Sequence, residues 1–270
     1  MRSLGLQVGF GQSICDQVPY LLERNITLVR QDLQDVPDEL LHARLTELDD
    51  TGVQGYFIMR GWQLKFAQPG QLVELVNEPT LDYPNRPAMT PEAYAAEWNT
   101  YGADAQARGV RLYALCPHNI YRETMDWCRQ VWALMDVKPR YVAVHRYPEH
   151  GGFEVPHPGF ASRDAEVQAL RDIIGDVPIC LSEFGYHNGP RKVRYGPFGL
   201  FSRTETWTPE QSAAQIRQEC EFWPKWGTDA AILYQINSSH TDPEDQYGVK
   251  YPDGSDKVPI VDVFRAEGAA

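Results

Sequence analysis

The sequence has few cysteines and no long apolar run. Its five cysteines, at positions 15, 116, 128, 180 and 220, are odd in number and widely spaced, and no two form a Cys-x-x-Cys motif. This pattern excludes a disulfide framework and argues against a structural zinc site. No apolar stretch approaches the roughly 18 residues of a membrane-spanning helix. We therefore expect no metal centre, no cofactor and no membrane partner.

Positive charge is also scarce: the 25 Lys and Arg residues are outnumbered by 37 Asp and Glu residues, which gives a net charge of −12. A protein of this balance lacks the basic surface that binds nucleic acid phosphates, so no nucleic acid partner is expected. The content of 43% hydrophobic and 23% charged residues is typical of a globular protein. No repeat or linker divides the chain, and we predict a single domain over residues 1–270, with its oligomeric state left open.

The amino terminus predicts a first strand rather than a leader peptide. Arg2 resembles the basic start of a secretory signal, but Gly5, Gln7 and Gly9 interrupt the short apolar stretch that follows. Two compartments stay open: the cytoplasm, or secretion after removal of a leader that precedes this sequence.

Short β-rich runs alternate with helical patterns along the whole chain. The runs are nearly continuous in Val, Ile, Leu and Tyr, which is typical of parallel strands buried on both faces. Eight such strands joined by helices predict a single (β/α)8 barrel, an α/β fold that typically takes about 250 residues. The predicted strands are Leu4–Phe10, Ile26–Gln31, Gly55–Arg60, Leu72–Asn77, Val110–Leu115, Tyr141–His145, Pro178–Ser182 and Ala230–Gln235.

Several helix ends are visible in the sequence. Thr90 and Thr208 each precede a proline, as an N-cap before a first helical Pro does, Ser162 is a further candidate cap, and Gly109 ends a helical pattern. The third strand–helix unit is shorter than the others, because only residues 61–71 separate the third and fourth strands. A parallel crossover needs about a dozen residues or more. We therefore predict a short or missing third helix.

Two glutamates, Glu78 and Glu183, directly follow buried strands. The active site of a parallel barrel lies at the carboxyl ends of its strands. A buried carboxylate is unfavourable unless it is paired or protonated, so two in one cavity suggest an acid and a nucleophile or base. Two carboxylates flanking a glycosidic bond are the machinery of glycoside hydrolysis. Either glutamate alone could instead cap the helix that follows it.

The motifs around these glutamates resemble those of a known superfamily. Val73–Pro79, with the sequence VELVNEP, resembles the fourth-strand motif of the clan A glycoside hydrolases, the barrel superfamily of cellulases, β-mannanases and β-xylosidases. Leu181–Gly185, with the sequence LSEFG, resembles the clan's seventh-strand motif. Leu28–Arg30, His145–Tyr147 and the closing segment 246–266 are further matches. The resemblance covers essentially the whole chain.

This resemblance implies a retaining glycosidase that cleaves β-glycosidic bonds of a poly- or oligosaccharide by double displacement. Glu78 would be the general acid/base and Glu183 the nucleophile. Asn77 would bind the sugar 2-hydroxyl, and Tyr147 and Arg30 would orient Glu183. Arg30 should lower the pKa of Glu183, whereas the carboxyl of Glu78 must stay protonated near neutrality to donate.

Other residues would complete the sugar site. His145 would line it, and Trp62 and Trp207 are candidates for stacking on sugar faces, because an aromatic ring offers a flat apolar surface. Many cellulase-like members carry a histidine at the end of the third strand, where this chain has Arg60, and a tryptophan at the end of the eighth, where we include Gln235 as substrate-binding. These departures leave the superfamily intact but leave the sugar open.

The longest predicted connection, residues 187–207, follows the seventh strand. It carries Arg191, Lys192, Arg194 and Arg203 among aromatic residues. Long loops in compact domains are usually functional or disordered, and the aromatic content favours order. We expect one wall of the cleft here, with a preference for an acidic or heavily hydroxylated glycan; a loop packed on the rim with solvated arginines is the alternative.

Two other functions remain open at this point. A metal-dependent isomerase or endonuclease barrel could use Glu78, His118, His145 and Glu183 as ligands, which would suit Mn or Zn. Against it, the fifth strand ends without a carboxylate, and an acidic protein is poorly suited to DNA. The third reading is a non-catalytic carbohydrate-binding barrel.

Overall fold

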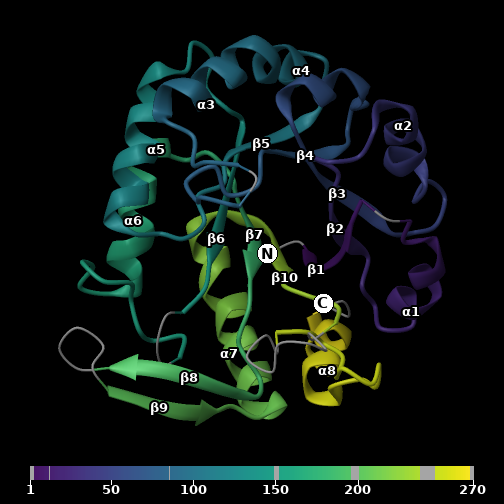
Figure 1. The fold of residues 1–270 in the computed structure, drawn as a ribbon, viewed down its shortest axis with the longest axis vertical. Helices are drawn as coiled ribbons and strands as arrows, with labels where there is room; N and C mark the ends of the chain where they lie inside the picture. Colours follow the sequence, from purple (N-terminus) through teal and green to yellow (C-terminus); the bar gives the residue numbers. More distant parts are fainter. Residues whose placement is uncertain are drawn as a thin grey trace.

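The computed structural model describes residues 3–11, 13–84, 86–148, 152–195, 201–237 and 247–267, and their side chains except those of 191–195 and 267. Eight parallel strands close into a barrel in the order β1-β10-β7-β6-β5-β4-β3-β2 (Figure 1). This confirms the predicted barrel. The strands are β1 (Ser3–Phe10), β2 (Leu28–Asp32), β3 (Gln54–Met59), β4 (Leu72–Leu75), β5 (Arg111–Leu115), β6 (Tyr141–Arg146), β7 (Ile179–Phe184) and β10 (Thr228–Leu233).

Helices surround the barrel because each crossover between parallel strands returns over its outer face. In the described residues Thr90, Ser162 and Thr208 accept hydrogen bonds from backbone N–H groups three residues on, as the predicted caps should. The α-helices are α1 (Val18–Leu22), α2 (Asp38–Thr46), α3 (Pro91–Glu97), α4 (Ala103–Ala107), α5 (Arg122–Leu134), α6 (Arg163–Ile174), α7 (Pro209–Phe222) and α8 (Val258–Glu267), with a π-helical turn (Trp98–Gly102) joining α3 to α4.

The third crossover is short, as predicted. A six-residue 3-10 helix, η2 (Gly61–Phe66), is the helical element between β3 and β4. A few residues suffice here because η2 packs directly on the turn between α3 and α4: the carboxylate of Glu97 accepts a hydrogen bond from the Gly61 N–H.

Two apolar clusters hold the barrel. One fills its interior and includes Leu28, Tyr56, Tyr113 and Ile232. The other lies between the strands and the helices. Successive side chains of a strand alternate between these two regions, so each strand is apolar on both faces. This explains why the strands appear in the sequence as continuous apolar runs. Near the carboxyl ends of the strands the interior becomes polar, with Arg30, Glu74 and His145, and at the opposite end Arg111 of β5 pairs with Asp229 of β10 at 3.8 Å.

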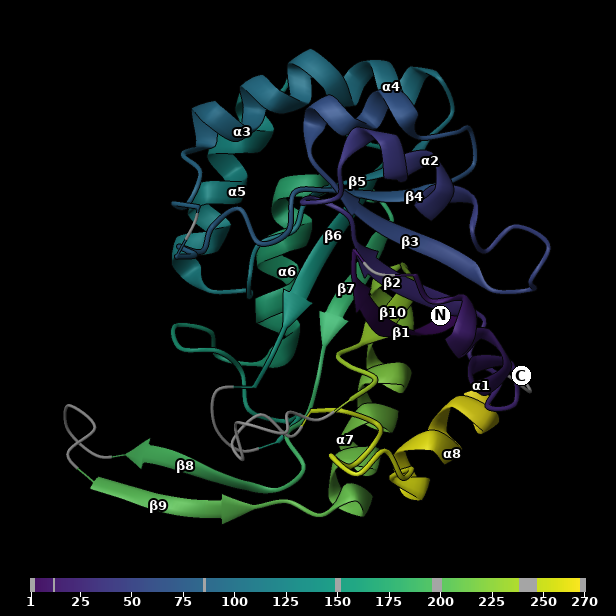
Figure 2. The ribbon, with the colours of Figure 1, turned by 45° about the vertical axis from the view of Figure 1, so that its right-hand side comes forward.

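Two strands were not predicted. β8 (Pro190–Tyr195) and β9 (Phe201–Thr206) pair antiparallel within the segment expected to be a long connection. Their polar, basic sequence lacks the apolar run of a barrel strand, and the hairpin projects away from the barrel beyond β7 in both ribbon views (Figure 2). No helix among the described residues is long and apolar enough to cross a membrane.

Candidate active site

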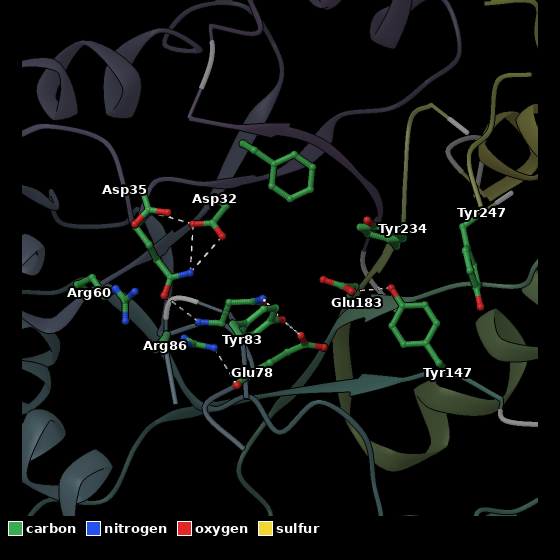
Figure 3. A pocket seen from close by; sticks show the side chains of 13 residues that line it. Asp32, Asp35, Arg60, Glu78, Tyr83, Arg86, Tyr147, Glu183, Tyr234 and Tyr247 are labelled. Atoms are coloured by element: carbon green, nitrogen blue, oxygen red, sulfur yellow. Dashed lines mark hydrogen bonds between the residues drawn. The ribbon is translucent and has the colours of Figure 1, made fainter. Parts of the chain in front are cut away.

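A cavity of about 580 Å³ opens at the carboxyl ends of the barrel strands. Figure 3 shows Glu78 and Glu183 facing into it, from the ends of β4 and β7. Both predicted carboxylates therefore share one cavity. The residues that line it are Phe10, Asp32, Gln34, Asp35, Arg60, Asn77, Glu78, Tyr83, Arg86, Tyr147, Glu183, Tyr234 and Tyr247.

Arg30 is the cation at the base of the cavity. Its buried guanidinium donates through Nη1 to Oε2 of Glu183 at 2.5 Å, and through Nη2 to Oε1 of Glu74 at 2.6 Å and Oδ1 of Asn77 at 2.7 Å. A guanidinium can satisfy several acceptors at once because its donors form a rigid planar fork. Arg30 thereby holds Glu183 and Asn77 in fixed positions.

Glu183 has a second fixed contact. Its Oε1 accepts a hydrogen bond of 2.6 Å from the Tyr147 hydroxyl, while Oε2 accepts from Arg30. The Arg30 guanidinium and the Tyr147 hydroxyl both stabilise the ionised carboxylate, and each donates to a different oxygen of it. This arrangement suits a carboxylate that must be charged and aimed at one point in the cavity.

Glu78 is held by His145 and Tyr83. Nδ1 of His145 lies 3.0 Å from Oε1 of Glu78, and the Tyr83 hydroxyl donates to Oε2. On its other side, Nε2 of His145 lies 3.1 Å from Nη2 of Arg30. The same Nε2 also lies 3.1 Å from Sγ of Cys116. Burial lowers the pKa of His145, but the charge of Glu183 and the hydrogen bond to Glu78 outweigh burial and raise it.

These contacts lower the pKa of Glu78. Burial by itself raises it, but the hydrogen bond and charge of His145, the hydroxyl of Tyr83 and the charge of Arg30 outweigh burial and bring the pKa to about 2. The expectation of a Glu78 that is protonated near neutrality is therefore wrong for the unliganded protein. The sequence could not show this, because Tyr83 and His145 reach Glu78 only through the fold.

Strained backbone marks the end of β4. Val76 and Glu78 have φ values of 61° and 42°, in the left-handed region that non-glycine residues seldom adopt. The left-handed turn at Val76 also ends the strand at Leu75, two residues before the predicted end at Asn77. Such strain is found where a structure must aim a side chain, and here it places Asn77 and Glu78 over the barrel mouth.

Five predicted substrate-binding residues do not line the cavity. Arg30 and His145 are fully buried beneath it, so the prediction that His145 lines the sugar site is wrong, and both act through the glutamates they contact. The other three are Trp62, Trp207 and Gln235. Trp62 lies on η2 and is 44% exposed outside it, and Trp207 stacks on Tyr186 with ring centroids 5.9 Å apart. Gln235 follows the end of β10, and Tyr234 lines the cavity in its place. The aromatic residues of the cavity wall are instead Phe10, Tyr83, Tyr147, Tyr234 and Tyr247.

Tyr147 is itself braced from behind. Its carbonyl accepts hydrogen bonds from Nδ2 of Asn119 at 3.0 Å and from Nε2 of His157 at 2.8 Å. The other ring nitrogen of His157 contacts Oε1 of Glu166 at 2.9 Å, and Nε of Arg146 donates to the same oxygen. His157 therefore links the Tyr147 carbonyl to the buried carboxylate of Glu166 through its two ring nitrogens.

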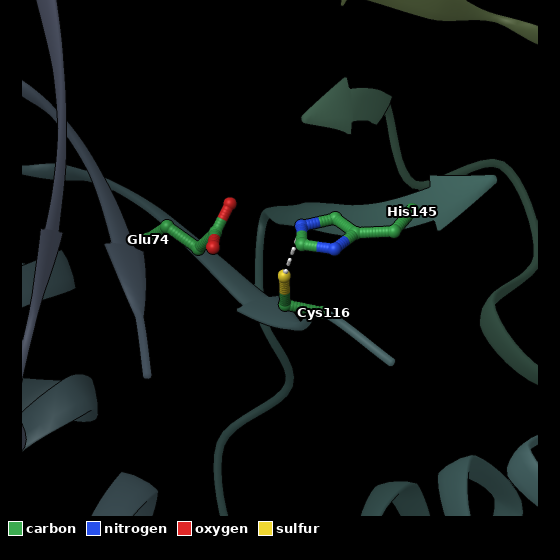
Figure 4. Close-up of side chains that lie close together, drawn as sticks. All are labelled: Glu74, Cys116 and His145. Carbon is green, nitrogen blue, oxygen red and sulfur yellow. Dashed lines mark hydrogen bonds between the residues drawn. The ribbon is translucent and has the colours of Figure 1, made fainter. Parts of the chain in front are cut away.

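The metal-site alternative has a partial geometric basis. One ligand atom each of Glu78, His145 and Glu183 lies within 4.8 Å of the others, and so do those of Glu74, Cys116 and His145 (Figure 4). Arg30, however, contacts Glu74, His145 and Glu183, so a fixed positive charge already stands between these groups. Burial also raises the pKa of the Cys116 thiol, which keeps it from being a thiolate ligand.

His118 takes no part in either cluster of the described residues. Its Nδ1 lies 2.8 Å from Oγ1 of Thr80 instead. The four-residue ligand set predicted from the sequence is therefore not assembled. These residues fit a network of hydrogen-bonded ion pairs better than a metal site.

The hairpin gives no support to the predicted cleft wall. No described residue between 188 and 207 lines the cavity, and the exposed Arg203 pairs with Glu205. The side chains of Arg191, Lys192 and Arg194 lie outside the described residues, as does Gln246 of the closing segment.

Several residues of the site were not predicted from the sequence: Glu74, which binds Arg30 but does not line the cavity, and the lining residues Tyr83, Arg86 and Tyr247. Glu74 interrupts the buried run of β4, and a charged residue inside a buried strand is a signal that could have identified it. Tyr83 and Arg86 lie in the connection after β4, and Tyr247 lies near the carboxyl terminus, where no local pattern marks them.

The sequence matches no known family model and no curated protein. The structure is similar to solved barrels. One is the family 39 glycoside hydrolase from the gut symbiont Bacteroides cellulosilyticus WH2, with a TM-score of 0.59 and 11% identity over 98% of this chain; this chain spans 64% of that protein. Another is the endo-β-1,4-mannanase from Thermotoga petrophila, with a TM-score of 0.60 and 11% identity over 100% of this chain and 76% of that one.

A third similar structure is an oligosaccharide-binding protein of glycoside hydrolase family 128 from Cryptococcus neoformans. Its TM-score is 0.55, at 13% identity over 97% of this chain and 94% of that one. At these identities the likeness shows the fold alone. That fold is a closed barrel of eight parallel strands, which agrees with the fold that the sequence motifs implied.

Proposed function

We propose that this chain is a retaining glycoside hydrolase that acts on β-glycosidic bonds of a poly- or oligosaccharide. The observation that carries the proposal is the Glu78–Glu183 pair, whose nearest carboxylate oxygens lie within 4.8 Å of each other in one cavity. Retaining glycosidases place their carboxyl groups about 5–5.5 Å apart, whereas inverting enzymes need a wider gap for water. The short separation favours retention.

The contacts of each glutamate fit its proposed role. Glu183, aimed by Arg30 and Tyr147, attacks the anomeric carbon as the bond to the leaving oxygen breaks, and Glu78 gives that oxygen a proton. A water molecule then attacks the glycosyl ester, Glu78 takes the proton of the water, and the carboxylate of Glu183 is released.

The low pKa of Glu78 in the free protein suits the second of these steps, in which it is a base. For the first step Glu78 must gain a proton. A bound sugar raises its pKa by excluding water, and the nearby charge of Glu183 acts in the same direction. When Glu183 becomes esterified this charge disappears and the pKa of Glu78 falls again, so one residue serves as acid and then as base.

The shape of the cavity supports an oligosaccharide substrate. A second hollow of about 290 Å³ shares Phe10, Asp32 and Asp35 with the main cavity and continues toward α2. Two adjoining hollows of about 580 and 290 Å³ suit a substrate of more than one sugar unit.

A panel of aryl glycosides and oligosaccharides tests the proposal, with wild type, Glu183→Gln and Glu78→Gln compared on each substrate. We expect turnover by wild type with retained anomeric configuration by NMR, and a loss of at least about 10³-fold in either variant. Gln168→Glu, a change on the exposed face of α6, is a matched control and should keep full activity. Binding of oligosaccharides without any turnover would favour the non-catalytic carbohydrate-binding barrel.

A further inference from the structure

Two arginines of the cavity have no acidic partner. Arg60 follows β3, and Arg86 lies in the connection between β4 and α3. In the described part of the chain, neither guanidinium has a carboxylate oxygen within 4.0 Å. Arg30, Arg146 and Arg163, the arginines buried elsewhere, each have one at 3.2 Å or less. The two cavity arginines therefore differ from the others.

The two arginines lie on one flank of the cavity. Figure 3 shows both on the side away from Tyr147 and Tyr247. Arg86 is fixed there, because its Nη2 donates to the backbone carbonyl of Glu78 at 3.1 Å and its guanidinium lies 4.8 Å from the ring centroid of Tyr83.

Their charges also act on each other. Burial lowers the pKa of Arg86, and the positive charge of Arg60 lowers it further. Tyr83, Glu78 and Asp32 act in the opposite direction, but the pKa of Arg86 stays lowered, and an anion beside both guanidiniums would relieve the repulsion between them. The pair is therefore a ready place for a negatively charged group.

The acidic residues of the cavity have other partners. Asp32 accepts hydrogen bonds from N and Nε2 of Gln34 at 2.9 to 3.2 Å, and Glu78 is bound by His145 and Tyr83. Asp35 is exposed at the rim. None of them lies within 4.0 Å of either guanidinium, so the two arginines keep their hydrogen-bond donors available to an anionic ligand, although Asp32 and Asp35 lie on the same side of the cavity (Figure 3).

We propose that Arg60 and Arg86 bind an anionic group of the glycan, either the carboxylate of a uronosyl unit or a sulfate ester, next to the cleavage point. Both groups present paired oxygens, which suit the planar fork of a guanidinium. The position of this group next to the cleavage point rests on the proposed function, since the two arginines share the cavity with Glu78. The site would explain why arginine stands at the end of β3.

The test measures the binding of free monosaccharides, which need no turnover. D-glucuronate, D-glucose 6-sulfate and D-glucose are titrated by NMR into wild type, Arg60→Gln, Arg60→Lys and Arg129→Gln. Arg129 is an exposed arginine on α5 and serves as the control. We expect one anionic sugar to bind wild type at least about tenfold more tightly than glucose, and raising the salt concentration to weaken that preference.

Arg60→Gln should reduce the preference to within about twofold, Arg60→Lys should keep part of it, and Arg129→Gln should keep all of it. The anion that binds more tightly identifies the substituent. Equal binding of all three sugars by wild type, or a preference that survives in a folded Arg60→Gln variant, would overturn the proposal. If the protein hydrolyses glycans but binds anionic and neutral sugars equally, the arginine site is contradicted and the proposed function is not. If it prefers an anionic sugar but hydrolyses no glycan, the proposed function is contradicted and the arginine site is not.

Discussion

Nη1 of Arg30 lies 2.5 Å from Oε2 of Glu183, and this contact joins the barrel interior to the candidate nucleophile. Replacing Arg30 by Met leaves the buried Glu74 and Glu183 uncompensated, which typically costs about 3–5 kcal/mol. We expect a lower melting temperature and a loss of at least about 10²-fold in kcat/KM. Arg30→Lys keeps the charge but cannot reach several acceptors, so it should fold nearly normally and still lose activity. Full activity in Arg30→Lys would contradict this role.

Tyr83 controls the proton affinity of Glu78. Its hydroxyl donates to the ionised carboxylate, so Tyr83→Phe should raise the pKa of Glu78. Since an acid catalyst must be protonated, kcat/KM of wild type should be highest at acidic pH and fall as the pH rises. In Tyr83→Phe this fall should move to higher pH by about one unit. An unchanged pH profile would show that the hydroxyl does not set this pKa.

His157 positions Tyr147 without reaching the cavity. His157→Gln removes one of its two ring contacts, so the Tyr147 carbonyl is held less firmly. We expect kcat to fall by about tenfold with little change in KM, because the aim of Glu183 is affected and the sugar contacts are not. Tyr147→Phe should show a larger loss of kcat. A His157→Gln variant with lower thermal stability but normal kcat would indicate a purely structural role.

Glu166 should make the fold sensitive to acid. Burial raises its pKa, but His157, Arg146 and Arg163 outweigh burial and lower it from 4.5 to about 2. Because the folded-state pKa is depressed, the stabilisation is present above about pH 4.5 and is lost as the pH falls toward 2. It amounts to about 3 kcal/mol. The melting temperature should therefore drop over this range, and less steeply in Glu166→Gln. Melting temperatures that fall equally steeply with pH in wild type and in Glu166→Gln would contradict this role of Glu166.

Phe10 offers the exposed aromatic surface that the sequence analysis assigned to tryptophans. It lines both hollows and is 62% exposed. Phe10→Ala should raise KM for an oligosaccharide by about three- to tenfold with little change in kcat, as expected for lost uniform binding. Trp62→Ala is the matched control and should leave KM unchanged. A higher KM in Trp62→Ala together with an unchanged KM in Phe10→Ala would instead support the sugar-stacking role predicted for Trp62.

The order of the elements could be predicted from local patterns. Strands buried on both faces are apolar throughout, and caps such as Thr90 and Thr208 mark helix starts, so eight strands and the short third crossover were recognisable. The β8–β9 hairpin was missed because its exposed strands lack that apolar signal. Strand ends differ from the predicted ones by one or two residues: β4 ends early at the left-handed turn of Val76, whereas β7 continues to Phe184, two residues past the predicted Ser182.

The sequence by itself determined which strand ends carry Glu78 and Glu183, because a carboxylate after a buried strand is a local feature. Only the tertiary structure decided their partners. Strand tilt and stagger in a barrel set which inward side chains meet, and the connections after the strands set which loop residues cover them. Hence the pairing of Arg30 with Glu74 and the contact of His145 with Glu78 follow from closure of the barrel, which brings together residues far apart in the chain. The hydrogen bond of Tyr83 to Glu78 follows instead from the path of the connection after β4.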